Sequence, residues 1–165
     1  IIKDSLNLYQ YGDNERAKRG TAIHLACQLW DENNLDENSI NEDIKENILQ
    51  YQKFLQDYKA RILQSEVRRF HPKYLYAGTC DKIAIINNEY WLIDIKTGGQ
   101  EIWHKWQTAA YVELMKKEIP ILRRGCLYLT NDNYQLVEYD YKMDFAEFLS
   151  LYTAYKIAKK YGYKK

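Results

Sequence analysis

The feature that most constrains the fold of this chain is a pair of apolar segments joined by a turn signal. Residues 75–86 and 89–96 are rich in Ile and Tyr, and each carries isolated charged side chains. Asn87-Asn88 separates the two segments, and asparagine is typical of tight turns because it tolerates the left-handed backbone conformation. The pattern predicts two antiparallel strands joined in a hairpin.

The charged side chains of this hairpin fall at positions that folding should bring together. Asp94 and Lys96 are two residues apart, so on a strand they point to the same face, whereas Ile93 and Ile95 point into a core. Folding back at the turn brings Asp81 near Asp94. Because Asp81 lies in an apolar run, its carboxylate would be costly there unless it is paired or bound to a metal.

The wider sequence predicts one α/β domain over residues 1–165, with a central mixed β-sheet flanked by helices. Apolar periodicity and turn signals predict the element order α-α-β-β-β-α-β-β-α. The expected helices are 15–30, 39–62, 103–117 and 144–160, and the expected strands are 65–70, 75–86, 89–96, 121–130 and 134–139. A capping-box signature from Ser39 to Glu42 should open the second helix.

Composition and charge argue against several classes of protein. The net charge of +1 does not by itself indicate a nucleic-acid binder, although Lys and Arg occur in local clusters. No run of about 18 apolar residues is present, so no membrane span is expected. The first residues do not form a signal peptide. Cys27, Cys80 and Cys126 are far apart, which favours reduced thiols in an intracellular protein over a zinc or iron–sulfur site.

Two carboxylates beside a lysine on adjacent strands can hold a hard divalent cation and a nucleophilic water. This chemistry suits hydrolysis of a phosphodiester. Each residue also has a simpler structural interpretation, since Asp81 could end a strand, and Asp94 and Lys96 could form a surface ion pair. Gln107 and Tyr111, one helical turn apart, could either pack their helix or line the cleft and hold the lysine or a phosphate.

Two further residues are ambiguous when taken singly. Glu66 could be an exposed strand residue paired with Arg68, or it could add a carboxylate to the metal site. His24 lies on a partly apolar helix, where a single histidine is more typical of a satisfied core or surface residue than of a metal ligand.

Five motifs nevertheless follow one another along the chain, in the order Gly20-Thr21-x-x-His24, Ser65-Glu66-Val67, Gly78-x-x-Asp81, Asp94-x-Lys96-Thr97 and Gln107-x-x-x-Tyr111. Together they resemble the PD-(D/E)XK nuclease superfamily, in its RecB-like branch, which includes the RecB and AddB nuclease domains, CRISPR-associated nucleases and phage exonucleases. The part from Ser65 to Gly78 resembles the mitochondrial genome maintenance exonuclease group. The resemblance covers roughly residues 19–130 and implies a restriction-endonuclease-like core.

The resemblance implies a role for each matched residue. One or two Mg²⁺ or Mn²⁺ ions would be bound by His24, Asp81, Asp94 and the backbone carbonyl of Ile95. Lys96 would position or activate the attacking water, Glu66 would be an active-site acid, and Gln107 and Tyr111 would support the site. The cysteines that hold an iron–sulfur cluster in many relatives are absent, so no cluster is expected. Residues 31–62 would be a helical insertion or lid.

The activity expected from these features is metal-dependent hydrolysis of DNA by a single-strand-acting exonuclease of replication, repair or recombination. The alternatives are a structure-selective endonuclease or resolvase, and an inactive fold that only binds nucleic acid or a partner protein.

The expected partner is DNA, as single strands or duplex ends, with a replication or recombination protein as a further candidate. No membrane partner is expected. The expected location is intracellular, in the cytoplasm of a bacterium or a phage-infected host, with an organelle as the alternative. The candidate DNA-binding residues are cations for phosphates and indoles for stacking on bases: Arg19, Arg68, Arg69, Trp103, Lys105 and Trp106.

Overall fold

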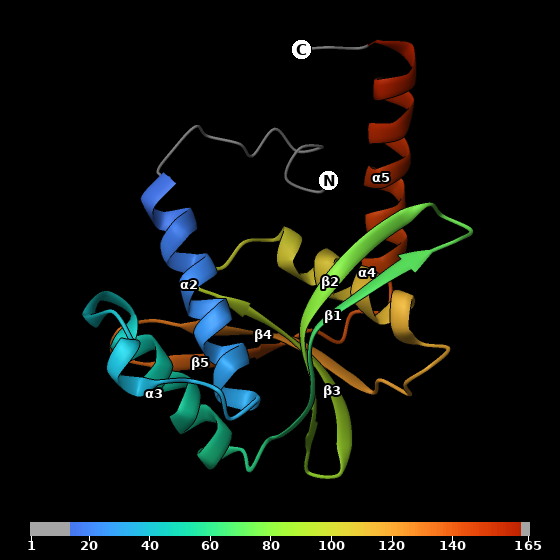
Figure 1. Ribbon diagram of the computed structural model, residues 1–165. Coiled ribbons are helices and arrows are strands. Elements are labelled where there is room, and N and C mark those ends of the chain that lie inside the picture. The colour runs from blue at the N-terminus through green and yellow to red at the C-terminus, as the bar shows by residue number, and fades with distance from the viewer. Residues whose placement is uncertain (1–13, 163–165) are drawn as a thin grey trace.

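The computed structural model describes residues 14–162, which form one β-sheet flanked by helices (Figure 1). The strands are β1 (Arg61–His71), β2 (Tyr76–Ile86), β3 (Glu89–Lys96), β4 (Arg123–Leu129) and β5 (Tyr134–Glu138). The helices are α2 (Asn14–Asp31), α3 (Glu42–Asp57), α4 (Trp103–Met115) and α5 (Asp144–Tyr161), with a short 3-10 turn, η1 (Glu37–Ser39), before α3. The predicted α/β class is confirmed, and over residues 14–162 the order of elements is the predicted one with η1 added.

The strands lie side by side in the order β1-β2-β3-β4-β5. The pairs β1–β2, β2–β3 and β4–β5 are antiparallel, whereas β3 and β4 are parallel, so the sheet is mixed as predicted. Helix α4 connects the parallel pair, which a tight turn cannot join. Asn87 and Asn88 form the β2–β3 turn with φ values of 51° and 63°, the conformation that this kind of hairpin turn requires.

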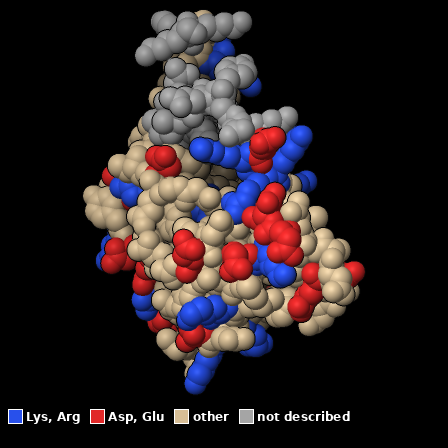
Figure 2. All heavy atoms as spheres, turned by 90° about the vertical axis from the view of Figure 1, so that its left-hand side faces the viewer, with Lys and Arg blue, Asp and Glu red and all other residues tan. Residues whose placement is uncertain are grey.

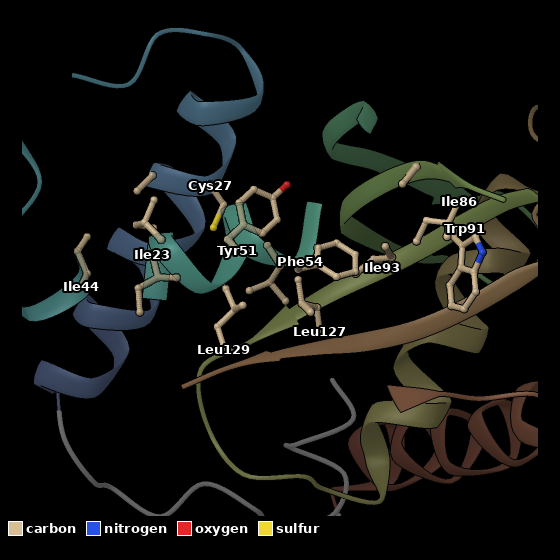
Figure 3. Close-up of a cluster of buried hydrophobic side chains, with 14 residues drawn as sticks. Ile23, Cys27, Ile44, Tyr51, Phe54, Ile86, Trp91, Ile93, Leu127 and Leu129 are labelled. Carbon is tan, nitrogen blue, oxygen red and sulfur yellow. The ribbon is translucent and has the colours of Figure 1, made fainter. Parts of the chain in front are cut away.

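Separate hydrophobic clusters cover the two faces of the sheet in the described part of the chain. On one face, α2 and α3 pack on β3 and β4 through side chains that include Ile23, Tyr51, Phe54, Ile93 and Leu127 (Figure 3). On the other face, α4 and α5 pack on β1, β2 and β3 through side chains that include Val67, Ile83, Leu92, Leu114 and Phe148. Ile93 and Ile95 therefore point into a core, as the alternation of β3 predicts.

The N-terminus of the second long helix differs from the prediction. Helix α3 begins at Glu42, because the side chain of Asn41 accepts a hydrogen bond from the Asp43 N–H (3.0 Å) and caps the helix. Ser39 instead donates to the carbonyl oxygen of Asp36 (2.7 Å) within η1. The predicted capping box at Ser39 is therefore wrong, since a local turn takes up its hydroxyl group.

The C-terminus of this helix was also predicted too far along the chain. Helix α3 ends at Asp57, and Lys59 then adopts a φ of 47°, which reverses the chain so that β1 can begin at Arg61. Residues 31–62, expected as a helical insertion or lid, contribute buried side chains of α3 to the core, among them Ile44, Ile48, Tyr51 and Phe54.

Strands β1 and β2 continue beyond the rest of the sheet as a protruding hairpin (Figure 1). Its tip lies beside α5, where the hydroxyl group of Tyr152 donates to the carbonyl oxygen of Leu75 (2.5 Å). The ring of Tyr76 also packs edge-on against Phe148, with centroids 5.0 Å apart. The hairpin is thus held against α5 on one side.

Among the described helices, none is both long enough and apolar enough to cross a membrane.

Candidate metal centre

Two carboxylates face each other across the first two strands. The register of β1 and β2 places Glu66 opposite Asp81, since the residues on either side of them are paired. Like charges directly opposite each other on antiparallel strands destabilise a sheet. Glu66 also has a φ of 53°, a left-handed conformation that is rare outside glycine and that tends to mark functional sites. This local arrangement favours a cation between the two carboxylates.

His24 reaches the same carboxylates from α2. Its Nδ1 lies 3.4 Å from Asp81 Oδ1, and ligand atoms of His24, Glu66 and Asp81 all lie within 4.8 Å of one another. Opposite ligands of an octahedral Mg²⁺ are about 4.2 Å apart, since each bond is about 2.1 Å. Small side-chain adjustments would therefore let all three bind one cation. We call these three residues the metal group.

The electrostatics of the metal group reflect an excess of negative charge. Burial raises the pKa of Glu66, and the charge of Asp81 raises it further. Burial opposes the charged form of His24, but its hydrogen bond to Asp81 and the charges of Asp81, Asp94 and Glu66 raise its pKa above the ordinary value. A cation bound here would favour the charged form of Glu66. It would also offset the negative charge that now raises the pKa of His24.

Asp81 is further fixed by the backbone of β3. The Ile95 N–H donates to Asp81 Oδ2 (2.6 Å), while Oδ1 is the oxygen near His24. This hydrogen bond sets the orientation of the carboxylate before any ion binds. The role of the Ile95 carbonyl oxygen as a metal ligand stays a prediction.

Asp94 lies beside the metal group but has a different partner. Burial and the charge of Asp81 raise the pKa of Asp94 well above its ordinary value. The Lys96 ammonium forms a close ion pair with Asp94 Oδ2 and opposes this rise. The structure thus groups Glu66, rather than Asp94, most closely with His24 and Asp81.

Helix α4 holds Lys96 in place. The ammonium of Lys96 donates to Gln107 Oε1 (2.8 Å), and Gln107 Nε2 donates to the hydroxyl oxygen of Tyr111 (2.7 Å). The ring of Trp103 lies 5.2 Å from Lys96 Nζ, a cation–π distance. Burial opposes the charge of Lys96, but Asp94 raises its pKa overall, so the side chain is an ammonium here. The geometry matches the interpretation in which Gln107 and Tyr111 hold the lysine.

Gly78 makes room for this chain of hydrogen bonds. A Cβ at position 78 would lie 2.5 Å from the ring of Tyr111, which no real contact allows. We expect Gly78→Ala to displace Tyr111 and to destabilise the fold by about 1–3 kcal/mol, the usual cost of overpacking. Urea unfolding measures this cost. Gly98→Ala is the matched control, because a Cβ there meets nothing within 4 Å, and equal stability of the two variants would contradict the prediction.

A buried ionic network behind the metal group was not predicted. Lys82 is only 1% exposed, and its ammonium lies 2.5 Å from Asp31 Oδ2 and donates to Ser65 Oγ (3.0 Å). Asp31 also accepts hydrogen bonds from the hydroxyl groups of Tyr51 (2.8 Å) and Ser65 (2.8 Å). The sequence indicated that such a network is needed, since a lysine inside the apolar run of β2 requires a buried counter-ion. It did not indicate which residue this is, because the counter-ion, Asp31, comes from the distant helix α2.

This network ties four elements together next to the site. Asp31 ends α2, Tyr51 lies on α3, and Ser65 and Lys82 are the chain neighbours of Glu66 and Asp81. We infer from this adjacency that the network fixes the backbone from which both carboxylates project.

The structure gives most of the predicted DNA-binding residues other partners. Arg19 donates to Asn47 Oδ1 (2.6 Å), to Asn131 Oδ1 (2.8 Å) and to a backbone carbonyl of α3. Arg69 makes a two-pronged ion pair with Glu118. These contacts join α2 to α3 and β1 to the end of α4.

The predicted residues of α4 are likewise engaged within the molecule. Lys105 pairs with Asp144 and Glu147, and the indole N–H of Trp106 donates to Glu147 (2.5 Å). Trp103 is buried and lies against Lys96. Arg68, by contrast, is exposed. On the face that carries α2 and α3, Lys and Arg lie intermixed with Asp and Glu rather than in one basic surface (Figure 2).

Comparisons with known proteins leave the family open. No family model matches this chain, and no curated protein matches it. Among solved structures, the chain is similar to the crystal structure of a protein named SSO0001, with 24% sequence identity and a TM-score of 0.44. The match covers 70% of this chain and 57% of that protein, so the chain spans little more than half of its length.

Proposed function

We propose that this chain is a metal-dependent DNA nuclease that hydrolyses phosphodiester bonds. The observation that carries the proposal is the convergence of the metal group, His24, Glu66 and Asp81, with the ion pair of Asp94 and Lys96. These side chains come from α2, β1, β2 and β3. Hydrolysis of a phosphodiester needs a cation site and a positioned ammonium close together, and this arrangement offers both.

The donor set suits a small divalent cation. Carboxylate oxygens are the preferred ligands of Mg²⁺ and Mn²⁺, whereas one imidazole shifts the preference toward Mn²⁺. The opposed carboxylates of Glu66 and Asp81 are the feature of the fold that a cation would stabilise. Thiolate ligands are not part of this group. We therefore propose Mg²⁺ or Mn²⁺ as the cofactor and no iron–sulfur cluster.

The bound cation, Lys96 and the side chains that hold Lys96 would have different roles in the reaction. When bound, the cation would offset the charge of the phosphate and lower the pKa of a bound water. Lys96, held by Asp94 and Gln107, presents its ammonium where negative charge develops on the phosphate. Gln107 accepts a hydrogen bond from Lys96 and donates one to Tyr111, so both residues position Lys96 from α4. Preorganisation of this kind lowers the barrier, because no side chain has to move during the reaction.

We propose that the RecB-like branch of the PD-(D/E)XK nucleases is the family to which this chain is related. The proposal rests on five ordered motifs, each of which supplies at least one side chain to the metal group or to the ion pair and hydrogen bonds around Lys96. A single-strand-acting exonuclease of replication, repair or recombination is the preferred activity. An intracellular location suits this function, since all three cysteines are buried free thiols.

The test is cleavage of end-labelled single-stranded and duplex DNA with Mg²⁺, Mn²⁺ or EDTA. We expect cleavage only with metal and a loss of about 10²–10³-fold in Lys96→Met, the usual cost of removing one charge-stabilising donor. Lys45→Met is the matched control, because Lys45 is exposed on α3 and should retain full activity. Undiminished cleavage by Lys96→Met would rule out the proposed site.

Two alternatives are separated in the same experiment. A circular single strand stays intact with an exonuclease, because that enzyme needs an end, and is cut by a structure-selective endonuclease. A chain that only binds nucleic acid leaves every substrate intact with every metal.

A further inference from the structure

The outer face of the β1–β2 hairpin forms an exposed row that begins at the metal group. Arg68 pairs with Thr79 and Phe70 with Ala77. Because alternate residues of an extended strand share a face, Arg68 and Phe70 form one row along β1, and this row starts two residues after Glu66 of the metal group. We call Arg68, Phe70, Thr79 and Ala77 the hairpin track. We propose that the hairpin track binds the unpaired strand of DNA next to the cleavage site, with one base stacked on Phe70.

The direction of the side chains follows from their neighbours on β1. Val67 is buried in the cluster formed with α4 and α5, Arg69 pairs with Glu118, and His71 lies 3.5 Å from Glu113 of α4. These three residues point toward α4, so Arg68 and Phe70 point the opposite way.

Phe70 is unusual for a residue on a well-supported strand. Its side chain is 58% exposed, although the hairpin is packed from behind. The hydroxyl group of Tyr76 donates to the Ala110 carbonyl (2.9 Å), and the ring of Tyr74 packs edge-on against Phe145, with centroids 5.8 Å apart. An exposed aromatic ring on a firm support is suited to stacking, since little conformational freedom is lost when a base binds.

The spacing of the row fits a single strand. Residues two apart on a strand are separated by about 6.6 Å, which is comparable with the length of one nucleotide in an extended chain. A phosphate beside the metal group would thus be followed by a phosphate near Arg68 and a base near Phe70. The small side chains of Thr79 and Ala77 leave the surface beside them open.

An unpaired strand explains these features better than a duplex or a protein does. The bases of a duplex are already stacked on one another, so Phe70 could stack only at an unpaired end. A duplex also calls for several phosphate contacts, whereas the hairpin track offers one cation, Arg68. The alternative occupant is a protein strand added to the edge of β1, and its affinity would come from backbone hydrogen bonds rather than from Phe70.

The inference rests on the proposed function, so its test measures binding separately from cleavage. The probe is a fluorescent oligothymidylate bound in the presence of Ca²⁺ without Mg²⁺ or Mn²⁺, followed by anisotropy. We expect Phe70→Ala to weaken binding by about tenfold, the effect of losing one stacked base, and Phe70→Trp to restore it. Leu122→Ala is the control, since Leu122 is 67% exposed at the far end of the sheet and should bind like the unmodified chain.

Arg68→Ala tests the phosphate contact. We expect this variant to weaken binding of the oligothymidylate and to reduce the slope of log affinity against log salt by about one. Arg61→Ala is the matched control, because Arg61 is exposed at the opposite end of β1 and should leave both quantities unchanged. In Phe70→Trp, quenching by the oligonucleotide in excess of that of the four native tryptophans in the unmodified chain would report the stacking contact.

The outcomes for the hairpin track and for the nuclease are distinguishable. If Phe70→Ala and Arg68→Ala bind and cleave single strands as the unmodified chain does, the hairpin track is wrong and the nuclease proposal stands. If the unmodified chain cleaves nothing but Phe70→Ala still loses affinity, the hairpin track stands and the chain is a binding module. An equal loss of affinity for blunt duplex in Phe70→Ala would also overturn the single-strand assignment.

Discussion

Replacing Asp81 with asparagine is expected to abolish metal-dependent DNA cleavage while leaving the chain folded. The asparagine keeps an oxygen that can accept the Ile95 N–H, but it removes the charge at the centre of the metal group. We expect cleavage to fall by at least about 10³-fold, since both the ion and its bound water would be lost. Gel analysis of end-labelled single strands in Mn²⁺ measures the effect.

The same variant gives a second readout that does not depend on activity. Asp81 lies opposite Glu66, so removing one of two like charges should leave the metal-free protein at least as stable as before. Mn²⁺ should raise the melting temperature of the unmodified chain but not that of Asp81→Asn. Asp132→Asn, on the exposed β4–β5 turn, is the control for loss of charge alone. An unchanged Mn²⁺ shift in Asp81→Asn would show that the ion binds elsewhere.

Replacing Asp31 with asparagine is expected to cause a large loss of stability. The substitution keeps the shape of the side chain, and an amide oxygen at the Oδ2 position can still accept hydrogen bonds from Ser65 and Tyr51, which lie 2.8 Å and 3.1 Å from that oxygen. It leaves Lys82 buried without a counter-ion. Breaking a buried ion pair in this way costs about 3–5 kcal/mol. For a chain of this size the melting temperature should fall on the order of 10 °C, as calorimetry would show.

A second substitution separates loss of the ion pair from other effects. In the double variant Asp31→Asn with Lys82→Met, no charge remains buried, and an apolar side chain fills the place of the lysine. We expect the double variant to recover most of the lost stability, because a buried ion pair and an apolar replacement of similar volume are often nearly equivalent. A double variant no more stable than Asp31→Asn alone would contradict the role assigned to Lys82.

Local sequence patterns predicted the elements of the fold well where several signals agreed. The β2–β3 hairpin has alternating apolar residues, an Asn87-Asn88 turn and strand-forming composition, and its bounds match those observed to within a residue. The start of α3 was predicted wrongly, because Ser39 and Asn41 are both good capping residues and the sequence does not say which one caps. The structure selects Asn41, since Ser39 is used within η1.

The candidate DNA-binding residues show where local patterns are weakest. A lysine or tryptophan has the same appearance in a sequence whether it faces solvent or a partner in the fold. Lys105 and Trp106 both contact Glu147, which is distant in the sequence and comes close only because α5 packs on α4. Phe70 was overlooked for the opposite reason, since an aromatic residue on a strand is usually buried.

The sequence by itself determined the chemistry that this chain could support. Asp94 and Lys96 share a strand, and Gln107 and Tyr111 share a helix face, because these relations depend only on the periods of local structure. Only the tertiary structure decided which charges meet. It paired Glu66 with Asp81 across β1 and β2, brought His24 from α2, and supplied Asp31 to the buried Lys82. Contacts between distant segments depend on how whole elements pack, and no local period encodes that packing.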